Sequence, residues 1–362
     1  MANGKCKENP MSEQEKDIKD LGEFGLIHHL TDQLPIHNPS TIKGVGDDCA
    51  VLKFDADKEV LVTTDLLLEG IHFDLTYVPL RHLGYKSAMV NISDVYAMGG
   101  TPRQITVSLG LSKRFTLADM EEFYDGLRLA CDAHNVDIVG GDTTSSLTGL
   151  MISITCIGDV ERGKAIYRSG AKPTDLICVS GNLGAAYLGL QLFEREKEVF
   201  YSQQAEAKGQ PIDFQPDFSG REYLLERQLK PEARGDIIRQ LRQLGIQPTA
   251  MMDISDGLSS ELLHICEDSH CGCRVYEEHI PLDYQTAAQA EEFNLNVITC
   301  ALNGGEDYEL LFTVPLADKE KVETMDDVKM IGYITDADEG KLLITRDGAQ
   351  FDIKAQGWNH LK

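Results

Sequence analysis

The sequence predicts an α+β protein built from two domains, each with strands covered by helices. Its length of 362 residues suits about two domains. Its 42% hydrophobic and 26% charged residues are typical of a globular protein with a sizeable core. Its apolar pattern alternates between short β-branched runs and longer helical periods. We expect a flexible polar segment over 1–20, a first domain over 21–162, and a second over 163–362 with an irregular insertion at 195–220.

The first domain is predicted to alternate strands and helices. Strands are expected over 59–64, 104–111, 137–139 and 150–158, and helices over 80–98 and 117–134. Thr116 is the predicted N-cap of the second helix. Asp94 lies inside the first, mostly apolar helix. The pair Gly140-Gly141 is expected to break its strand and to present Asp142 on a loop.

The second domain is predicted to be rich in strands. They are expected over 175–180, 249–253, 308–314 and 328–335, with a hairpin over 341–353 that turns at Asp347-Gly348. Helices are expected from 185 to about 193, over 231–244 and over 258–268. Residues 195–220 are polar, contain two prolines and show no clear period, which predicts irregular structure.

The composition excludes several classes of protein. A net charge of −25 argues against a nucleic-acid surface, where a basic stripe is expected. It would also repel an anionic substrate unless bound cations reversed the local charge. No stretch of the sequence approaches the run of about 18 consecutive apolar residues that a membrane-spanning helix needs. The polar first 20 residues do not resemble a signal peptide, and nine scattered cysteines suit buried thiols in a reducing cytoplasm.

Aspartates recur where an apolar or glycine-rich stretch leads up to them. The six segments are Gly44-Val45-Gly46-Asp47-Asp48, Thr63-Thr64-Asp65, Asn91-Ile92-Ser93-Asp94, Gly140-Gly141-Asp142-Thr143, Asp253-Ile254-Ser255-Asp256-Gly257 and Gly304-Gly305-Glu306-Asp307. Carboxylates beside apolar strands are costly unless a cation or hydrogen-bond donors compensate them. Their oxygens suit Mg²⁺, which also binds phosphate oxygens. The recurrence predicts a site for several Mg²⁺ ions and a polyphosphate.

Two of these acids have simpler alternative roles. Asp94 has apolar neighbours on its helix, so it is either a metal ligand, an N-cap, or the partner of Lys86 or Arg103 in a buried ion pair. Asp256 precedes a helix and suits both a cap and a site beside bound phosphate, because helix N-termini attract anions.

Common nucleotide-binding signatures are absent. Gly84-Tyr85-Lys86-Ser87 lacks the upstream glycine of a phosphate-binding loop because Pro79 stands there. Gly44-Val45-Gly46 lacks the third glycine of a dinucleotide fingerprint, and the protein-kinase motif set is missing. Any nucleotide is therefore expected to be held chiefly through metal ions and backbone groups.

A cysteine cluster offers a second, weaker metal hypothesis. Cys266, Cys271 and Cys273, with His264 and His270 nearby, contain donors for zinc. They lack the paired C-x-x-C spacing that makes a zinc site specific, and the spacing favours structural thiols.

Seven segments resemble the thiamine-monophosphate kinase family. They are GVGDDCAVL at 44–52, TTDLLLEGIHF at 63–73, KSAMVNISDVYAMGGTPR at 86–103, GGDTTSS at 140–146, RSGAKPTD at 168–175, DISDGLSSEL at 253–262 and NGGEDYELLFTV at 303–314. The resemblance runs from about Glu23 to the C-terminus. The wider superfamily of ATP-using synthetases, including aminoimidazole ribonucleotide and selenophosphate synthetases, shares only the general plan.

The resemblance implies a fold, an assembly and a reaction. The fold is a two-domain synthetase-like one, in which the N-terminal domain forms a dimeric β-barrel flanked by helices and the C-terminal α+β domain packs against it. The reaction is ATP-dependent phosphorylation of thiamine phosphate to thiamine diphosphate, with several Mg²⁺ ions. In-line transfer to an acceptor phosphate needs no strong general base, so no catalytic side chain and no phosphoenzyme are expected.

The resemblance also implies roles for individual residues. The implied magnesium set is Asp48, Thr63, Thr64, Asp65, Asp94, Asp142, Asp253 and Asp256. The implied ATP contacts are Gly141, Asp142, Arg168 and Ser255, and the implied substrate contacts are His72, Glu306 and Trp358. From the residues alone, Trp358 is equally suited to a core or lid position, His72 to a loop, and Glu306 to a strand end.

Two other functions remain open from the sequence. One is a different ATP-using synthetase of the same superfamily. The other is a Mg²⁺-nucleotide sensor without turnover, which the intact acids at all six segments disfavour.

Overall fold

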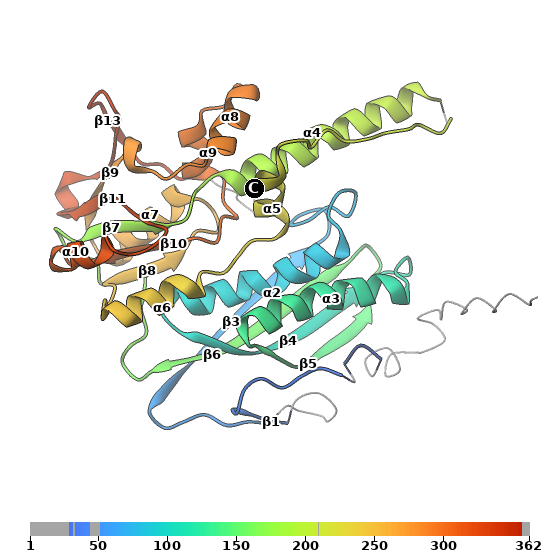
Figure 1. Cartoon of the computed structure of the whole chain (residues 1–362), viewed down its shortest axis with the longest axis horizontal. Helices are drawn as coiled ribbons and strands as arrows, with labels where there is room; N and C mark the ends of the chain where they lie inside the picture. The colour runs from blue at the N-terminus through green and yellow to red at the C-terminus, as the bar shows by residue number, and fades with distance from the viewer. Residues whose placement is uncertain (1–28, 32, 44–50, 209, 357–362) are drawn as a thin grey trace, which may run out of the picture.

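The computed structural model describes residues 29–31, 33–43, 51–208 and 210–356 (Figure 1). The predicted flexible segment 1–20 and the predicted site residues Asp48 and Trp358 lie outside the described residues. Two sheets dominate the described chain, one in each half, and a short pair of strands, β1 (Thr41–Lys43) and β2 (Val51–Leu52), precedes them.

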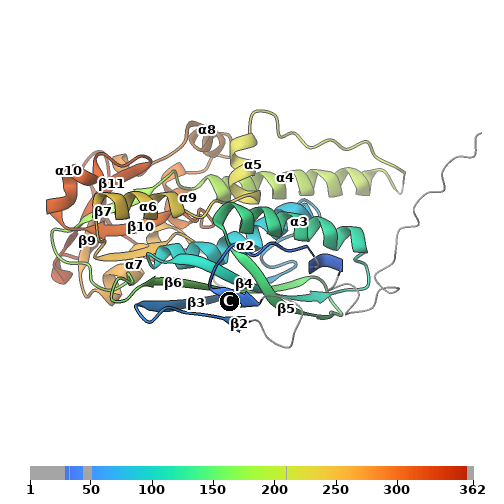
Figure 2. The same ribbon diagram turned by 60° about the horizontal axis from the view of Figure 1, so that its bottom comes forward.

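The first half forms a four-stranded sheet with the strand order β3-β6-β4-β5. The strands are β3 (Lys58–Leu68), β4 (Thr101–Leu111), β5 (Asp137–Ser145) and β6 (Met151–Glu161). Strand β6 is antiparallel to both of its neighbours, whereas β4 and β5 are parallel. Helices α2 (Leu80–Ala97) and α3 (Leu117–His134) cover one face of this sheet (Figure 2). The predicted Thr116 cap is confirmed, because Thr116 and Asp119 form a reciprocal capping box.

The opposite face of this sheet carries exposed apolar side chains. Strand β3 alternates, so that Thr63 and Asp65 face the helices while Val62 and Leu66 face outward. Val62 is 65% exposed and Leu66 is 50% exposed. Within the described ranges each sheet is open and no closed barrel is present, so the dimeric barrel stays a prediction.

The second half forms a seven-stranded sheet with the order β13-β12-β9-β11-β7-β10-β8. The strands are β7 (Leu176–Ser180), β8 (Ala250–Asp253), β9 (Gly272–Tyr276), β10 (Leu310–Val314), β11 (Val328–Thr335), β12 (Lys341–Ile344) and β13 (Gln350–Asp352). The helices are α4 (Ala185–Glu206), α5 (Glu222–Leu229), α6 (Gly235–Leu244), α7 (Leu258–Asp268), α8 (Tyr284–Glu292), α9 (Val297–Asn303) and the short α10 (Lys319–Val322). All neighbours are antiparallel except β12 and β9.

One hydrophobic cluster joins the two halves. It contains Ile92 of α2 together with Met251 of β8 and Phe312 of β10. Because α2 packs against both sheets, residues on this helix can position side chains from either half.

The structure corrects three details of the predicted elements. Strand β5 does not break at Gly140-Gly141 but continues to Ser145, and Asp142 lies within it. A Cβ on Gly141 would come within 1.9 Å of the Val107 carbonyl oxygen, so glycine there permits close strand contact. Helix α6 starts at Gly235 and not at Pro231, because the backbone of Arg234, with φ −84° and ψ 50°, is not helical.

The third correction concerns the predicted irregular insertion. Helix α4 continues to Glu206, so only the later part of 195–220 lacks regular structure. The segment after the helix returns along it, and Phe218 packs edge-on against Phe193, as does Phe214 against Phe200 (Figure 1). These aromatic contacts stabilise a helix whose own sequence has little apolar periodicity.

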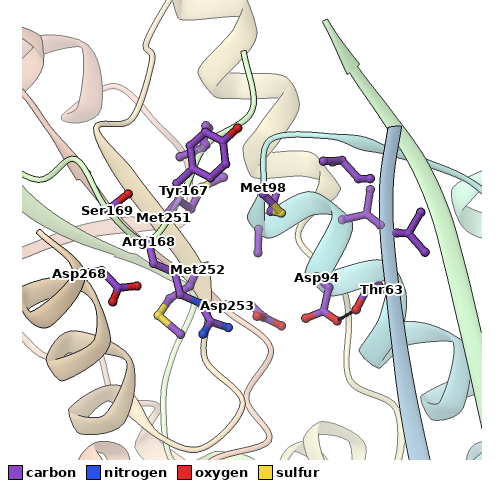
Figure 3. Close-up of a pocket in the computed structure, with 15 residues that line it drawn as sticks. Thr63, Asp94, Met98, Tyr167, Arg168, Ser169, Met251, Met252, Asp253 and Asp268 are labelled. Carbon is purple, nitrogen blue, oxygen red and sulfur yellow. Dashed lines mark hydrogen bonds between the residues drawn. The ribbon is translucent and has the colours of Figure 1, made fainter. Parts of the chain in front are cut away.

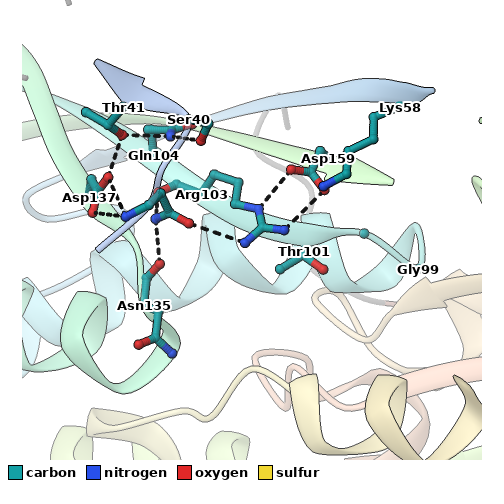
Figure 4. A network of polar contacts seen from close by, with 12 residues as sticks. Ser40, Thr41, Lys58, Gly99, Thr101, Arg103, Gln104, Asn135, Asp137 and Asp159 are labelled. Carbon is teal, nitrogen blue, oxygen red and sulfur yellow. Dashed lines mark hydrogen bonds and ion pairs between the residues drawn. The ribbon is translucent and has the colours of Figure 1, made fainter. Parts of the chain in front are cut away.

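A polar network fixes the segment before β1 to the four-stranded sheet (Figure 4). The Asp137 carboxylate accepts hydrogen bonds from the Asn38 backbone N–H and from Thr41 Oγ1. In the same region Asp159 pairs with Arg103 Nε and Lys58 Nζ, both at 2.8 Å. Arg103 is therefore engaged by Asp159 and not by Asp94 of α2.

Candidate active site

A cavity of about 430 Å³ lies between the two halves (Figure 3). Its walls come from β3, α2, the connecting segment 166–169, β8 and the end of α7. Four residues predicted for the site line it: Thr63, Asp94, Arg168 and Asp253. These four residues, separated by up to 190 positions, therefore share one pocket.

Helix α2 positions the acids of the cavity by direct hydrogen bonds. Asp94 accepts a hydrogen bond from Thr63 Oγ1 at 2.5 Å. The preceding residue, Ser93, donates through Oγ to Asp253 Oδ2 at 2.5 Å. One turn earlier, Asn91 Oδ1 accepts the backbone N–H of Asp65 at 3.1 Å. One helix thus fixes acidic residues from β3 and β8 around its own Asp94.

The alternative roles for Asp94 are wrong. It lies in the interior of α2 and caps no helix. Lys86 pairs with Glu306 Oε1 at 2.8 Å, and Arg103 pairs with Asp159. The cation near Asp94 is Arg168, which lines the same cavity and partly offsets the rise that burial causes in the pKa of Asp94.

Burial and mutual repulsion destabilise the ionised form of the acids at this site and so raise their pKa values. Burial raises the pKa of Asp253 to about 7, and the Asp94 charge adds to this rise. Burial likewise raises the pKa of Asp65 to about 6, again with a contribution from Asp94. The pKa of Asp94 itself is raised by burial, against the opposing effect of the Thr63 hydrogen bond. Hard oxygen donors of this kind, desolvated and without an ion pair to any described side chain, fit a divalent cation.

A ready-made metal cage is nevertheless absent from the described part of the chain, where no three His, Cys, Asp or Glu side chains are arranged to hold an ion. Additional ligands are needed, and phosphate oxygens and water are the usual ones for Mg²⁺.

Other predicted metal residues lie apart from the cavity. The Thr64 side chain faces the opposite side of β3, where its Oγ1 donates to the Ile154 carbonyl at 3.1 Å. Asp142 and Gly141 are exposed on β5, at the sheet edge opposite β3. Within one chain, two strands separate these residues from Asp65.

The loop after β8 presents Ser255 and Asp256 at the surface. The predicted capping role of Asp256 is wrong, because the N-cap of α7 is Gly257 and no side chain caps the helix. The Asp256 backbone N–H instead donates to the buried Glu261 Oε1 at 3.0 Å. The Ser255 carbonyl accepts the Glu306 N–H at 2.7 Å, which joins the two acidic loops.

The predicted substrate contacts occupy two further positions. His72 lies in the turn after β3, where its Nδ1 accepts the Leu68 N–H at 3.0 Å. Glu306 is held by Lys86 and by Gln228 Nε2, the latter at 2.9 Å. The roles of Ser93, Asn91 and Gln228 were missed in the sequence. Ser93 and Asn91 had a signal, as polar residues beside Asp94 in the Asn91-Ile92-Ser93-Asp94 segment, whereas Gln228 had none.

The seven described cysteines are buried and form no disulfide, as predicted for structural thiols. Cys266, Cys271 and Cys273 belong to the hydrophobic core of the second half. Across the described segments, no helix combines the length and the apolar character needed to cross a bilayer.

Comparison with known proteins first gives the class. Residues 46–160 match the family "AIR synthase related protein, N-terminal domain". A solved structure described as "AaThiL complexed with AMPPCP and TMP" has a TM-score of 0.70 and 33% identity, over 96% of this chain and 100% of that chain. Residues 46–160 are therefore of the AIR synthase-related class, and the whole chain shares its fold with that solved structure.

Curated relatives identify the branch of that class. The chain is 31% identical over 350 residues to thiamine-monophosphate kinase of Bacillus subtilis, covering 94% of this chain and 100% of the relative. It is 34% identical over 343 residues to the Aquifex aeolicus enzyme, covering 95% and 99%. The chain belongs to the thiamine-monophosphate kinase family, which confirms the resemblance predicted from its motifs.

Proposed function

We propose that this chain transfers the γ-phosphoryl group of ATP to thiamine phosphate and forms thiamine diphosphate. The observation that carries the proposal is that Asp94 and Asp253 line one cavity, with Asp65 held near Asp94 through Asn91 of the same helix. Family membership supports the choice of substrate. A similar structure described as holding AMPPCP and TMP supports the pairing of a nucleotide with this acceptor.

Several Mg²⁺ ions are part of the proposal. Asp65, Asp94 and Asp253 would hold them, because their burial and repulsion favour a bound cation. Such ions neutralise charge on the transferring group and reduce the repulsion between two phosphates. Asp48 and Asp256 are proposed as further ligands, Asp256 from the turn just after Asp253. Thr63 is proposed to orient Asp94 and Thr64 to contribute its backbone carbonyl.

The nucleotide and the acceptor are assigned to different parts of the site. Arg168 in the cavity wall and Ser255 in the loop after β8 are proposed ATP contacts. Arg168 supplies a guanidinium, which suits phosphate oxygens. Glu306, His72 and Trp358 are proposed contacts of the thiamine ring system, with Glu306 facing its positive charge.

A homodimer completes the proposal. Val60, Val62, Leu66 and Met151 form an exposed apolar stripe on β3 and β6, at 38–65% exposure. An apolar sheet face of this kind is the expected contact for a second copy. The second copy would also explain Asp142 and Gly141, because β5 of a partner can approach a cavity that β5 of the same chain does not reach.

The proposal is tested by incubating purified protein with thiamine phosphate, ATP and Mg²⁺. Equal amounts of ADP and thiamine diphosphate are expected, with none formed when EDTA removes the Mg²⁺. ADP release without thiamine diphosphate would favour another ATP-using enzyme of the superfamily. Saturable ATP binding without turnover would favour a sensor; either result contradicts the proposal.

A further inference from the structure

Lys86 is a buried cation that the proposed chemistry does not use. It lies on α2 with its side chain only 7% exposed. Its Nζ binds Glu306 Oε1 at 2.8 Å and the Gln228 backbone carbonyl at 3.2 Å. A buried ammonium is costly, so its retention on an apolar helix calls for a reason.

The partner of Lys86 is held in a fixed and unusual conformation. Glu306 has a φ of +58° and follows Gly305 at +72°. A Cβ on Gly305 would come within 2.6 Å of the Ser255 carbonyl oxygen, and the Glu306 N–H donates to that same oxygen. The loop therefore directs the Glu306 side chain toward α2, where Lys86 receives it. A left-handed non-glycine residue persists only when its surroundings enforce it.

Gln228 of α5 completes the contact. Its Nε2 donates to Glu306 Oε2 at 2.9 Å, so both carboxylate oxygens have a donor. The other amide atom, Oε1, is buried and has no hydrogen-bond partner within the described residues. Leaving a buried acceptor unpaired is unfavourable, because its desolvation is not compensated. The Gln228 side chain therefore binds Glu306 through its amide nitrogen although its amide oxygen stays unpaired.

These features do not form an efficient stabilising pair. The Glu306 side chain is 31% exposed while Lys86 is almost fully buried. A partly exposed carboxylate gains less from the pair than a buried one, and the ammonium bears most of the desolvation cost. The contact fixes the direction of one carboxylate that remains open to solvent and hence to a ligand.

We propose that Lys86 is a positioning residue for the acceptor substrate. It holds the Glu306 carboxylate oriented toward the cationic ring system, and this inference rests on the proposed function. Lys86 and Asp94 lie eight residues apart on α2, which is about 12 Å along the helix. The same helix thereby positions the Glu306 carboxylate, which is proposed to contact the substrate, and the proposed metal ligands. Because the helix is one rigid element, it fixes the distance between them.

The test is calorimetric binding of thiamine phosphate and of thiamine to wild type and Lys86→Met, each in the presence of AMPPCP and Mg²⁺. Loss of a charge-assisted contact predicts an increase in Kd of about tenfold or more. Both ligands are expected to lose affinity by the same factor, because they share the rings. AMPPCP affinity is expected to stay within about twofold, and Lys86→Arg to recover most of the loss.

The matched control is Lys58→Met, which removes another ammonium in a 2.8 Å ion pair, with Asp159 outside the cavity. It is expected to leave both Kd values unchanged. A loss confined to thiamine phosphate would overturn the inference, since Lys86 would then contact the phosphate directly. Unchanged affinity in Lys86→Met would overturn it as well. Failure of wild type to bind thiamine phosphate would instead overturn the proposed function.

Discussion

Replacing Asp94 by asparagine separates catalysis from folding. The amide oxygen can still accept the Thr63 hydroxyl, so the 2.5 Å contact has a substitute. The change also removes the charge that repels Asp65 and Asp253. We therefore expect the metal-free protein to be at least as stable as wild type, with a melting temperature equal to or above that of wild type.

Turnover is expected to respond in the opposite direction. A proposed Mg²⁺ ligand acts on charge that develops in the transition state, and losing such a group costs about 10²-fold or more in kcat. The assay is formation of thiamine diphosphate at saturating ATP and Mg²⁺, beside a thermal melt of the metal-free variant. A wild-type rate in Asp94→Asn would refute the assignment of this residue.

Asp159→Asn is the matched control for that experiment. Asp159 is also buried, but Arg103 and Lys58 lower its pKa against the effect of burial. Its amide would leave two half-exposed cations without their partner, at a cost of about 1–2 kcal/mol. This variant should therefore be less stable but active, the reverse of the pattern for Asp94→Asn.

Three further outcomes follow from the assembly and the packing. Mixing inactive Asp94→Asn and Asp142→Asn proteins should restore about a quarter of wild-type turnover if a partner supplies Asp142, and no recovery would place both residues in one chain's site. Val62→Glu, on the exposed apolar stripe, should convert the dimer to monomers in light scattering and lower turnover; an intact dimer would exclude this face. Gly84→Ala should lower the free energy of unfolding by about 2 kcal/mol in urea, because its Cβ would meet the Phe123 carbonyl oxygen at 1.9 Å, and an unchanged midpoint would contradict that packing.

Local signals made much of the fold predictable. Helix α7 and strand β11 have the predicted bounds, because turn residues flank clear apolar periods. Residues 195–206 carry little period of their own, and the aromatic contacts of α4 come from a segment that returns along it. The Gly140-Gly141 pair suggested a break in the strand. The reason for glycine at 141 is close contact with the neighbouring strand β4, which the local sequence does not show.

The candidate site was predictable in residue type but not in arrangement. The acids of β3, α2 and β8 were found because carboxylates stand out in apolar segments. Alternation along a strand already predicts that Thr64 faces the opposite side of β3 from Thr63 and Asp65. The resemblance of the whole TTD motif to the family led us to group all three residues. The distance of Asp142 from the cavity follows from strand order, which no local pattern encodes. The contact of Lys86 with Glu306 joins residues 220 positions apart across the two halves.

Counting bound divalent ions tests most directly whether the buried acids form a metal site. Mn²⁺ can replace Mg²⁺ and is measured by electron paramagnetic resonance in the presence of AMPPCP and thiamine phosphate. More than one Mn²⁺ per chain is predicted for wild type, with at least one lost in Asp94→Asn and in Asp253→Asn. The same number of ions bound by all three proteins would contradict the account.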